Sequence, residues 1–489
     1  MGRGCWVIVI LLISCTSSKH YSPGRKYSNV ELKEDYKLLK SALEQKHPSL
    51  YWYTPKDSMD MYFKLYEEAI IDSMTEQQFN WKVLAPLINK IHCGHTSVNM
   101  SKGYQKWVKN RKLPSFPLYL KMWKDTMAVT ASLKRNDSVF SRGTIVHSIN
   151  CLNVKQLTSI IFDYLPEDGY ADNISYIRLS SSFPYFHRNI FGLSPIYKVS
   201  YSDSTGKIKQ ADLPIYKPSA DSVVKDSVKV RLPKVKIPRK TKLVSYRSLV
   251  VDSSGYAIMT LNTFTKGYLR KFFRQSFREL KKEHINHLAL DIRLNGGGKI
   301  GLSTLLTRYV SRKSFRIADS VYARSKTLYP FTHYFKGKIF NNLQLAITTK
   351  RKSDGLFHQQ HLERKVFSPK KKFHYDGKLY VIISGPTFSA ASLFSSSVKG
   401  QEGIRLVGEE TGGGWHGNDG VMIPEFTLPN TRLRITFPLF RLVQYNHVPK
   451  TGSGVIPDIY IGTSYDALLK GYDKKIKSVK EMMIQDIKK

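Results

Sequence analysis

Residues 378–398 read KLYVIISGPTFSAASLFSSSV, and this stretch decides the fold around it. A short β-rich run at 379–384 is followed by a Gly-Pro-Thr turn, and the small residues from Ser389 onward suit a helix. The sequence therefore predicts that Ser389 lies where a strand ends and a helix begins. Unpaired N–H groups of a first helical turn would stabilise a developing oxyanion there. The alternative is an ordinary N-cap serine on a strand-to-helix loop.

Strands and helices are predicted to alternate on both sides of this stretch. The patterns indicate strands at 256–261, 287–293 and 404–407, and helices at 267–285 and 301–310. Such alternation is typical of an α/β sheet, whose sites form at the carboxyl ends of the strands.

A glycine-rich loop follows the strand predicted at 287–293. Residues 291–301 read DIRLNGGGKIG, and Gly296, Gly298 and Gly301 satisfy the G-x-G-x-x-G pattern of a dinucleotide site. A single match is a weak signal. The first residues of the chain also resemble an export signal, and an exported protein seldom meets NAD. We therefore favour the other use of bare glycine N–H groups at a strand end, an oxyanion hole formed by Gly297 and Gly298. Asp291 and Arg293 are interpreted as a structural pair that braces this loop.

The first residues of the chain resemble an export signal. A basic start, an apolar run at 6–13 and Leu-Ile-Ser-Cys at 12–15 are typical of a bacterial lipobox, in which Cys15 is lipidated. The apolar run is too short to span a bilayer. We therefore predict a signal peptide at 1–14, a tether at 15–28, and a globular body held by acyl chains at the outer membrane, facing the periplasm. The alternative is a plain secretory signal.

The composition narrows the classes of protein further. The 489 residues leave room for two or three domains, and Cys93 and Cys151 cannot make a disulfide framework. Lys and Arg number 77 against 38 Asp and Glu. Nucleic acid is the usual partner of such a charge, but export argues against it. A basic surface that faces an anionic lipid leaflet or an acidic polymer fits better, and a merely solvated lysine-rich surface is the alternative.

The remaining segments are assigned by pattern. We expect a helical domain at 29–104, a β-rich domain at 113–215, a basic linker or insertion at 216–247, a catalytic domain at 248–465 and a basic helix at 466–489. Within the β-rich domain, residues 142–154 resemble the core of a PDZ domain, a fold that binds peptide C-termini by strand addition. His92 and His95 end the helical domain, but no third ligand lies near them in sequence, so no metal or cofactor is predicted.

Five motifs occur in an order that resembles peptidase family S41, which includes the tail-specific (C-terminal processing) proteases, the tricorn core protease and the interphotoreceptor retinoid-binding protein repeats. They are GHT at 94–96, LDIRLNGGG at 290–298, TFSAAS at 387–392, VGEETGG at 407–413 and GVIPDI at 454–459. The resemblance covers most of 29–465. It implies a ClpP/crotonase-like α/β catalytic core preceded by an N-terminal helical domain and a PDZ-like β-rich domain.

The resemblance also indicates which residue is the general base. In the tail-specific proteases that the chain resembles, the base is the lysine of a Ser/Lys dyad, 25 positions after the serine. That position here is Gly414, and no lysine lies between Lys399 and Lys450. The tricorn-like branch uses the early histidine, which is His95 here. In that branch an acid orients the histidine, but the aligned residue here is Thr451. Thr451, Glu410, Asp419 and Asp458 therefore stay open as the orienting group.

The resulting hypothesis is a serine endopeptidase that acts on exported or envelope proteins. Ser389 would be the nucleophile, His95 the general base, and the N–H groups of Ala390 and of Gly297 or its neighbour the oxyanion hole. Protein or peptide substrates are the expected partners. The alternatives are a catalytically inactive periplasmic peptide-binding protein on the same fold, or an esterase that uses the same serine.

Overall fold

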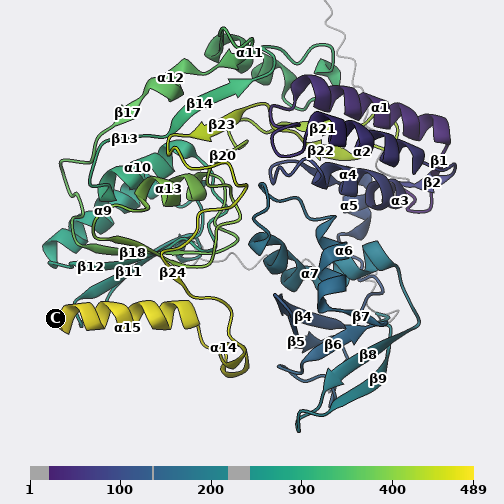
Figure 1. Ribbon diagram of the computed structural model, residues 1–489, viewed down its shortest axis with the longest axis horizontal. Coiled ribbons are helices and arrows are strands. Elements are labelled where there is room, and N and C mark those ends of the chain that lie inside the picture. Colours follow the sequence, from purple (N-terminus) through teal and green to yellow (C-terminus); the bar gives the residue numbers. More distant parts are fainter. Residues whose placement is uncertain (1–20, 135–136, 219–242, 489) are drawn as a thin grey trace, which may run out of the picture.

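The computed structural model describes residues 21–134, 137–218 and 243–488 (Figure 1). The predicted signal peptide, Cys15 and most of the predicted linker at 216–247 lie outside these ranges. None of the helices within them combines the length and the apolarity needed to cross a membrane.

A six-stranded sheet forms the centre of the predicted catalytic domain. Its strand order is β10-β11-β12-β18-β19-β24, in which β10 is antiparallel to β11 and the other neighbours are parallel. The strands are β10 (Arg247–Val251), β11 (Tyr256–Leu261), β12 (His287–Asp291), β18 (Lys378–Ile383), β19 (Ile404–Gly408) and β24 (Ile459–Tyr460). The predicted α/β core is therefore confirmed.

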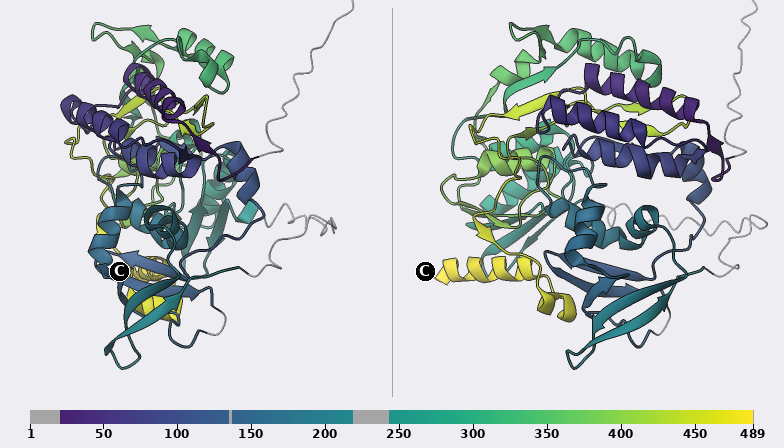
Figure 2. Two further views of the ribbon diagram at one scale, coloured as in Figure 1. Left: turned by 90° about the vertical axis from the view of Figure 1, so that its right-hand side faces the viewer. Right: turned by 45° about the vertical axis from the view of Figure 1, so that its right-hand side comes forward.

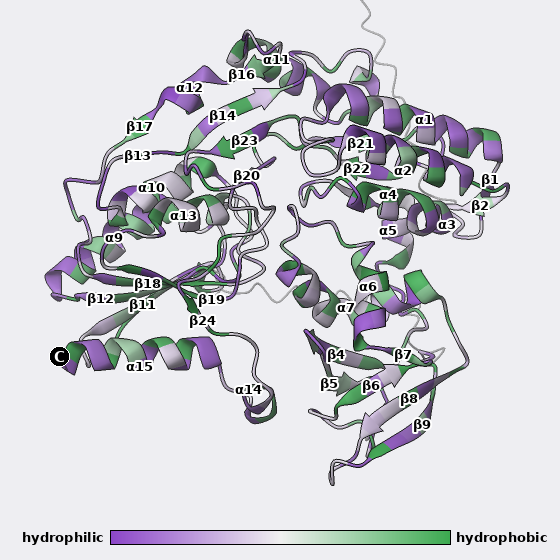
Figure 3. Cartoon of the chain, in the orientation of Figure 1, coloured by the Kyte–Doolittle hydropathy of each residue, from purple (hydrophilic) through white to green (hydrophobic). Residues whose placement is uncertain are grey.

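Alternating side chains bury both faces of this sheet. Leu288 and Leu290 belong to the apolar core beneath three helices, whereas Ala289 belongs to the smaller core beneath α15. The helices are α9 (Leu269–Lys282), α10 (Ile300–Val310) and α13 (Ala390–Val398) on one face and α15 (Lys474–Lys488) on the other (Figure 1). Because a strand's side chains point to opposite faces in turn, this two-sided burial requires a nearly continuous apolar run. The central strand β18 is accordingly mostly green, the colour of hydrophobic residues, in Figure 3.

The helical region near the N-terminus is less regular than predicted. It contains α1 (Asn29–Lys46), α2 (Lys56–Glu68), α3 (Glu76–Phe79), a π-helix (Asn80–Leu84), α4 (Ala85–Asn89) and α5 (Lys102–Val108). The helical residues from Glu76 to Asn89 thus form three short consecutive pieces. The apolar core of this region is not its own, because it continues into residues 317–345 and 422–442.

One smaller sheet ties this helical region to the rest of the chain, and a second contributes to the apolar core that they share. In one, β3 (Ser97–Asn99) pairs with β22 (Arg434–Thr436), which pairs with β21 (Glu425–Thr427). The other has the order β15-β16-β14-β23-β20. Its strands are β15 (Lys350–Arg351), β16 (Phe357–His358), β14 (Ala318–Ala323), β23 (Arg441–Gln444) and β20 (Gly417–Asn418).

The β-rich region at 113–215 also contains a long helix that we did not predict. Its strands are β4 (Leu118–Trp123), β5 (Thr126–Ser132), β6 (Val146–Ile149), β7 (Leu152–Asn153), β8 (Ile196–Ser202) and β9 (Ile208–Pro214), and its helices are α6 (Val154–Phe162) and α7 (Asn173–Phe191) (Figure 2). A non-helical Ser182 and the internal Pro184 interrupt α7, which explains its weak sequence signal. The PDZ-like character of this region stays a prediction.

Candidate active site

Ser389 lies at the junction of β18 and α13 in a conformation that L-residues rarely adopt. Its φ is 53° and its ψ is −123°, and its side chain makes no capping hydrogen bond with the helix. The interpretation of Ser389 as an ordinary N-cap is therefore wrong. A positive φ at a non-glycine residue costs free energy and persists only where the surrounding structure fixes it. Here the strained turn leaves the hydroxyl half-buried at the carboxyl end of the central sheet.

The glycine loop after β12 packs against this turn because β12 and β18 are neighbouring parallel strands. Phe388 N–H donates a hydrogen bond to Asn295 O (3.0 Å), and Thr387 Oγ1 donates to Ile292 O (3.1 Å). A Cβ on Gly297 would lie 2.7 Å from the Ser389 Cβ. The approach of the two loops therefore requires a residue without a side chain at 297.

Two backbone N–H groups beside Ser389 are available to an oxyanion. Gly297 N–H already donates to Asn295 Oδ1 (2.9 Å), so it is engaged. Phe264 N–H donates to Gly297 O, and Lys299 N–H donates to Phe264 O, as between two parallel strands. The N–H of Gly298, between these two residues, therefore points away from Phe264. Within the described residues, neither this N–H nor that of Ala390 has an acceptor. Gly298 and Ala390 thus have free N–H groups, and Gly297 is the spacer that brings the two loops together.

His95 reaches the serine from the helical region. It lies between α4 and β3, and the pairing of β3 with β22 fixes the direction of its loop. Its ring packs on Phe388 at 4.7 Å between centroids, and the residue is 8% exposed. The point where a Cβ on Gly420 would stand lies 2.6 Å from Ser389 Oγ and 3.0 Å from His95 Nε2. The hydroxyl and the imidazole therefore face one small space, which stays open because residue 420 is glycine.

An acid that we did not predict lies behind the imidazole. Asp168 Oδ1 is 3.8 Å from His95 Nδ1, an ion-pair separation, and this buried nitrogen has no hydrogen-bond partner within the described residues. Asp168 belongs to the loop between α6 and α7. Its carboxylate accepts hydrogen bonds from Gly94 N–H (2.7 Å) and Gly414 N–H (3.4 Å). Gly414 occupies the position at which a Ser/Lys dyad would have its lysine. Its N–H here helps to hold Asp168 instead.

The surroundings keep Asp168 ionised. Its burial alone would raise the pKa of the carboxyl, but His95, the charge of Arg441 and the N–H of Gly94 outweigh burial and lower the pKa below its ordinary value. A buried carboxylate beside Nδ1 favours the tautomer whose Nε2 is free to accept a proton, and it would stabilise the imidazolium that results.

None of the four groups left open by the sequence contacts His95. Thr451 Oγ1 hydrogen-bonds Ser453 Oγ (2.9 Å), and Glu410 accepts from Gly454 N–H (2.6 Å). Asp458 pairs with Lys399 (2.6 Å). Thr451 is therefore bonded elsewhere, and the acid beside His95 is Asp168. No motif marked Asp168, because the histidine is 73 positions away in another predicted domain. Its only signal was an acidic residue in a Pro-Glu-Asp-Gly turn after a helix.

Asp419 instead belongs to a buried brace below His95. Its carboxylate accepts hydrogen bonds from Ser49 Oγ (2.7 Å) and Cys93 Sγ (2.9 Å), and Arg441 Nη1 lies 3.6 Å from it. Burial raises the pKa of the Cys93 thiol, which therefore stays protonated and acts as the donor. The brace thus fixes Cys93, two residues before the histidine.

The brace contains donor types that bind metals, since His47, Cys93 and Asp419 place one donor atom each within 4.8 Å of the others. Both ring nitrogens of His47 are occupied, however: Nδ1 accepts from Ser49 N–H and Nε2 is 2.7 Å from Thr96 Oγ1. A cation would also stand beside the buried guanidinium of Arg441. The arrangement therefore fits a hydrogen-bonded network better than a metal site.

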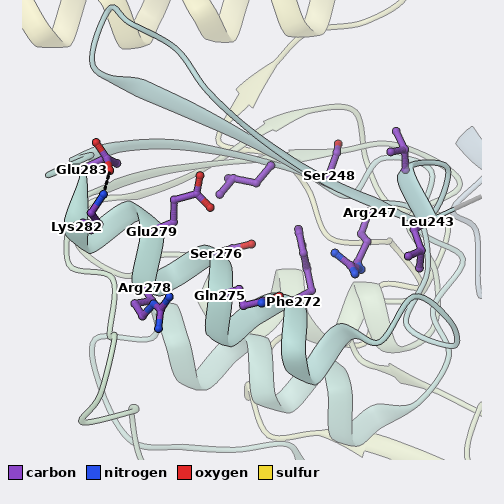
Figure 4. A pocket seen from close by; sticks show the side chains of 12 residues that line it. Leu243, Arg247, Ser248, Phe272, Gln275, Ser276, Arg278, Glu279, Lys282 and Glu283 are labelled. Atoms are coloured by element: carbon purple, nitrogen blue, oxygen red, sulfur yellow. Dashed lines mark hydrogen bonds and ion pairs between the residues drawn. The ribbon is translucent and has the colours of Figure 1, made fainter. Parts of the chain in front are cut away.

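Arg293, predicted to brace the glycine loop, lies 2.9 Å from Asp291 and also contacts Asp473 beside α15. A separate groove of about 700 Å³ lies between β10 and α9 (Figure 4). It is lined by residues such as Arg247, Phe272 and Glu279, and none of the predicted catalytic residues borders it.

Comparisons with known proteins agree with this fold. Residues 255–461 match the family model described as peptidase family S41. Among solved structures, mature CPAF is similar at 12% identity and a TM-score of 0.62, and mature CPAF complexed with lactacystin at 12% and 0.61. Each match covers 94% of this chain and 98% of the other. No curated protein matches the sequence. At such identities the structural likeness shows a shared fold, and the match to the model of peptidase family S41 covers the central sheet and its loops.

Proposed function

We propose that the protein is a serine peptidase in which Ser389 is the nucleophile, His95 the general base and Asp168 the residue that orients and charges the base. One observation carries the proposal: a strained serine at a strand–helix junction shares a small space with the Nε2 of a buried histidine, and a buried carboxylate stands behind the Nδ1 of that histidine. The match to the peptidase family S41 model and the shared fold support peptide-bond hydrolysis as the reaction class.

The acylation step follows from the positions of these groups. Ser389 Oγ attacks the carbonyl carbon of the scissile peptide while His95 Nε2 takes the hydroxyl proton. The carbonyl oxygen becomes an oxyanion that accepts hydrogen bonds from the N–H groups of Gly298 and Ala390. The C–N bond then breaks, and the imidazolium of His95 returns the proton to the leaving amine. The new amino terminus departs, and an ester on Ser389 remains.

Water completes the cycle by the same route. His95 takes a proton from a water molecule, the resulting hydroxide adds to the ester carbonyl, and the same two N–H groups hold the second oxyanion. The C–O bond to Ser389 then breaks, and His95 gives its proton back to Oγ. The product is a peptide with a free carboxylate, and the site returns to its starting protonation.

A fluorophosphonate probe tests this proposal, because it reacts only with an activated serine. The wild-type chain should be labelled, and Ser389→Ala should lose the label entirely. Ser397→Ala is the matched control, since that hydroxyl lies on the same helix and donates to the carbonyl of Leu393. A wild-type chain that stays unlabelled, or a label retained by Ser389→Ala, would contradict the proposal and favour a binding protein on the same fold.

We further propose that this peptidase acts in the cell envelope, anchored through Cys15, and that the region at 113–215 captures peptide C-termini. The lipobox pattern supports the first part. Its test is metabolic labelling with a fatty acid, which should mark the wild type and leave Cys15→Ala unmarked.

The capture of peptide C-termini has its own test. Amidation of a peptide's C-terminal carboxylate should weaken its binding, and equal binding of the amidated and the free peptide would rule out carboxylate capture.

A further inference from the structure

Helix α11 (Lys338–Thr348) turns its apolar side away from the protein. Ile339, Phe340, Leu343 and Ile347 are 79%, 68%, 56% and 71% exposed, and their spacing places them on one stripe of the helix. The inward side is formed by Leu345 and the polar Asn341. This is the reverse of α9, whose large apolar residues are buried. An exposed apolar stripe of this kind marks a surface that contacts something other than water.

The orientation of α11 is fixed by polar contacts with the body of the protein. Asn341 Nδ2 donates to Lys336 O (3.0 Å), and Asn342 Oδ1 accepts from Leu328 N–H (2.7 Å). Leu345 belongs to the core that the helical region shares with 317–345. The helix therefore cannot roll its apolar side inward without breaking these contacts. In Figures 1 and 2 it lies at the outer edge of the molecule in every view, where a flat surface can reach it.

The segment that carries this stripe has cations but no acidic residues. Residues 320–353 contain no Asp or Glu, and their cations are Arg324, Lys326, Lys336, Lys338, Lys350, Arg351 and Lys352. Lys336, Lys350 and Arg351 are exposed, at the two ends of the helix. Of the seven, only Lys352 forms an ion pair within the described residues, with Glu363. Exposed Tyr329, at 73%, adds an aromatic ring to the same segment.

We propose that α11 and its flanking cations, which we name the α11 face, bind the surface of an anionic lipid bilayer. Apolar side chains flanked by Lys and Arg, with an aromatic residue nearby, are the features of an interfacial helix. Anionic headgroups supply the opposite charge. A second copy of the chain would bring the same seven cations to the contact, so like charges oppose a symmetric dimer through this face. The proposal depends neither on Ser389 nor on an acyl chain at Cys15.

Vesicle flotation of the full chain carrying Cys15→Ala tests the proposal, because no lipid anchor can then contribute. Binding is compared between vesicles of phosphatidylglycerol with phosphatidylcholine and vesicles of phosphatidylcholine alone. We expect binding to the anionic vesicles that weakens as salt rises. Equal binding to both kinds of vesicle, or no binding to either, would overturn the proposal.

Paired variants locate the contact. In the Cys15→Ala chain, Phe340→Gln with Ile347→Gln should reduce binding at least about tenfold. The matched control is Met61→Gln with Leu65→Gln, two exposed apolar residues on α2, which should bind as the parent does. An equal loss in both pairs would overturn the assignment to α11. So would a change from dimer to monomer in sedimentation when the α11 pair is replaced, which would favour a second copy as the occupant.

A further pair of double variants tests the contribution of the cations to binding. Lys350→Gln with Arg351→Gln should weaken binding to anionic vesicles by about 30-fold. Lys271→Gln with Lys281→Gln on α9 removes the same charge from another exposed surface and should have a much smaller effect. Phe340→Trp gives a direct readout, since brominated lipid should quench the fluorescence that the new indole adds. If brominated lipid left this added fluorescence unchanged, insertion of the helix would be contradicted.

Discussion

The two halves of the candidate active site are built in different ways. Ser389 and the glycine loop follow two neighbouring strands of one sheet, and their loops meet because parallel strands end at the same edge. His95 and Asp168 come from segments outside that sheet. They are joined by the hydrogen bond from Gly94 N–H to Asp168, which links residues 74 positions apart in sequence. The apolar core beneath α13 holds the serine half, whereas buried polar contacts hold the histidine half.

This difference shows where each half is vulnerable. Apolar packing is distributed over many contacts, so single substitutions in the apolar core beneath α13 mainly change stability. A buried polar network depends on each of its members, because removing one leaves its partner unsatisfied. The histidine half should therefore lose function through single-atom changes that leave the serine half intact.

The largest expected effect is that of Asp168→Asn, which removes the charge behind His95 and keeps the size of the side chain. We expect the rate of acylation to fall by about 10³-fold to 10⁴-fold. Thr451→Ala is the comparison, and it should change the rate by no more than about twofold, as for a surface residue. Burst kinetics with an activated ester measure both. A larger loss in Thr451→Ala than in Asp168→Asn would return the orienting role to Thr451.

Gly420→Ala should have the next largest effect, because its Cβ would stand 2.6 Å from Ser389 Oγ and 3.0 Å from His95 Nε2. Displacing either group by an ångström costs about 10²-fold in rate. Gly296→Ala is the control, since a Cβ there meets nothing within 4 Å and neither glycine has a positive φ. Fluorophosphonate labelling rates compare the two variants. Equal labelling of both would show that Ser389 and His95 do not share the space at residue 420.

The smallest expected effect is a response of the histidine half to acid. Burial lowers the pKa of His47 to about 4, so the unfolded chain, with an ordinary histidine pKa, binds more protons than the folded one between pH 6.5 and 4. Stability falls as pH drops through this window, by about 2 kcal/mol between pH 7 and pH 5. Asp168 contributes little to this loss of stability. The pKa of its carboxyl is lowered in the folded protein, so its stabilising contribution is lost only below this pH window.

Hydrogen exchange can separate the halves in this test. Between pH 7 and pH 5, after correction for the intrinsic rate, amides at 92–99 should lose more protection than amides at 390–398. His47→Gln should remove much of this difference, whereas His187→Gln, whose pKa is also lowered to about 4 by burial, lies in the β-rich region and should not. Uniform loss of protection across both halves would contradict a local origin.

The two halves also differ in how far the sequence predicts them. The strand at 256–261 was predicted with the bounds that the structure has, and the run predicted at 379–384 lies one residue from β18, because both are short apolar runs bordered by turn residues. The placing of Ser389 and the glycine loop in one site followed from the expectation that sites form at the carboxyl ends of strands and from the resemblance. Which glycine N–H is free did not, since it depends on Asn295 turning its side chain toward Gly297.

The histidine half was predicted only through a resemblance. His95 could be placed in the site by its Gly-His-Thr motif, but Asp168 could not, because no periodicity links a loop after α6 to a loop after α4. Likewise, α7 was missed because its signal is interrupted at Ser182 and Pro184. The outward apolar stripe of α11 has the period of any amphipathic helix, and only the structure shows which side faces the core.

The core that α1 to α4 share with 317–345 and 422–442 has a consequence for the order of events during synthesis. The N-terminal helices are made first, but more than 200 further residues must follow before their apolar partners exist. Until then these helices have no complete surface on which to pack, and His95 has no β22 strand to align it. A growing or interrupted chain therefore carries His95 without Ser389, and under the proposed mechanism hydrolysis begins only when the last third of the chain closes over the first.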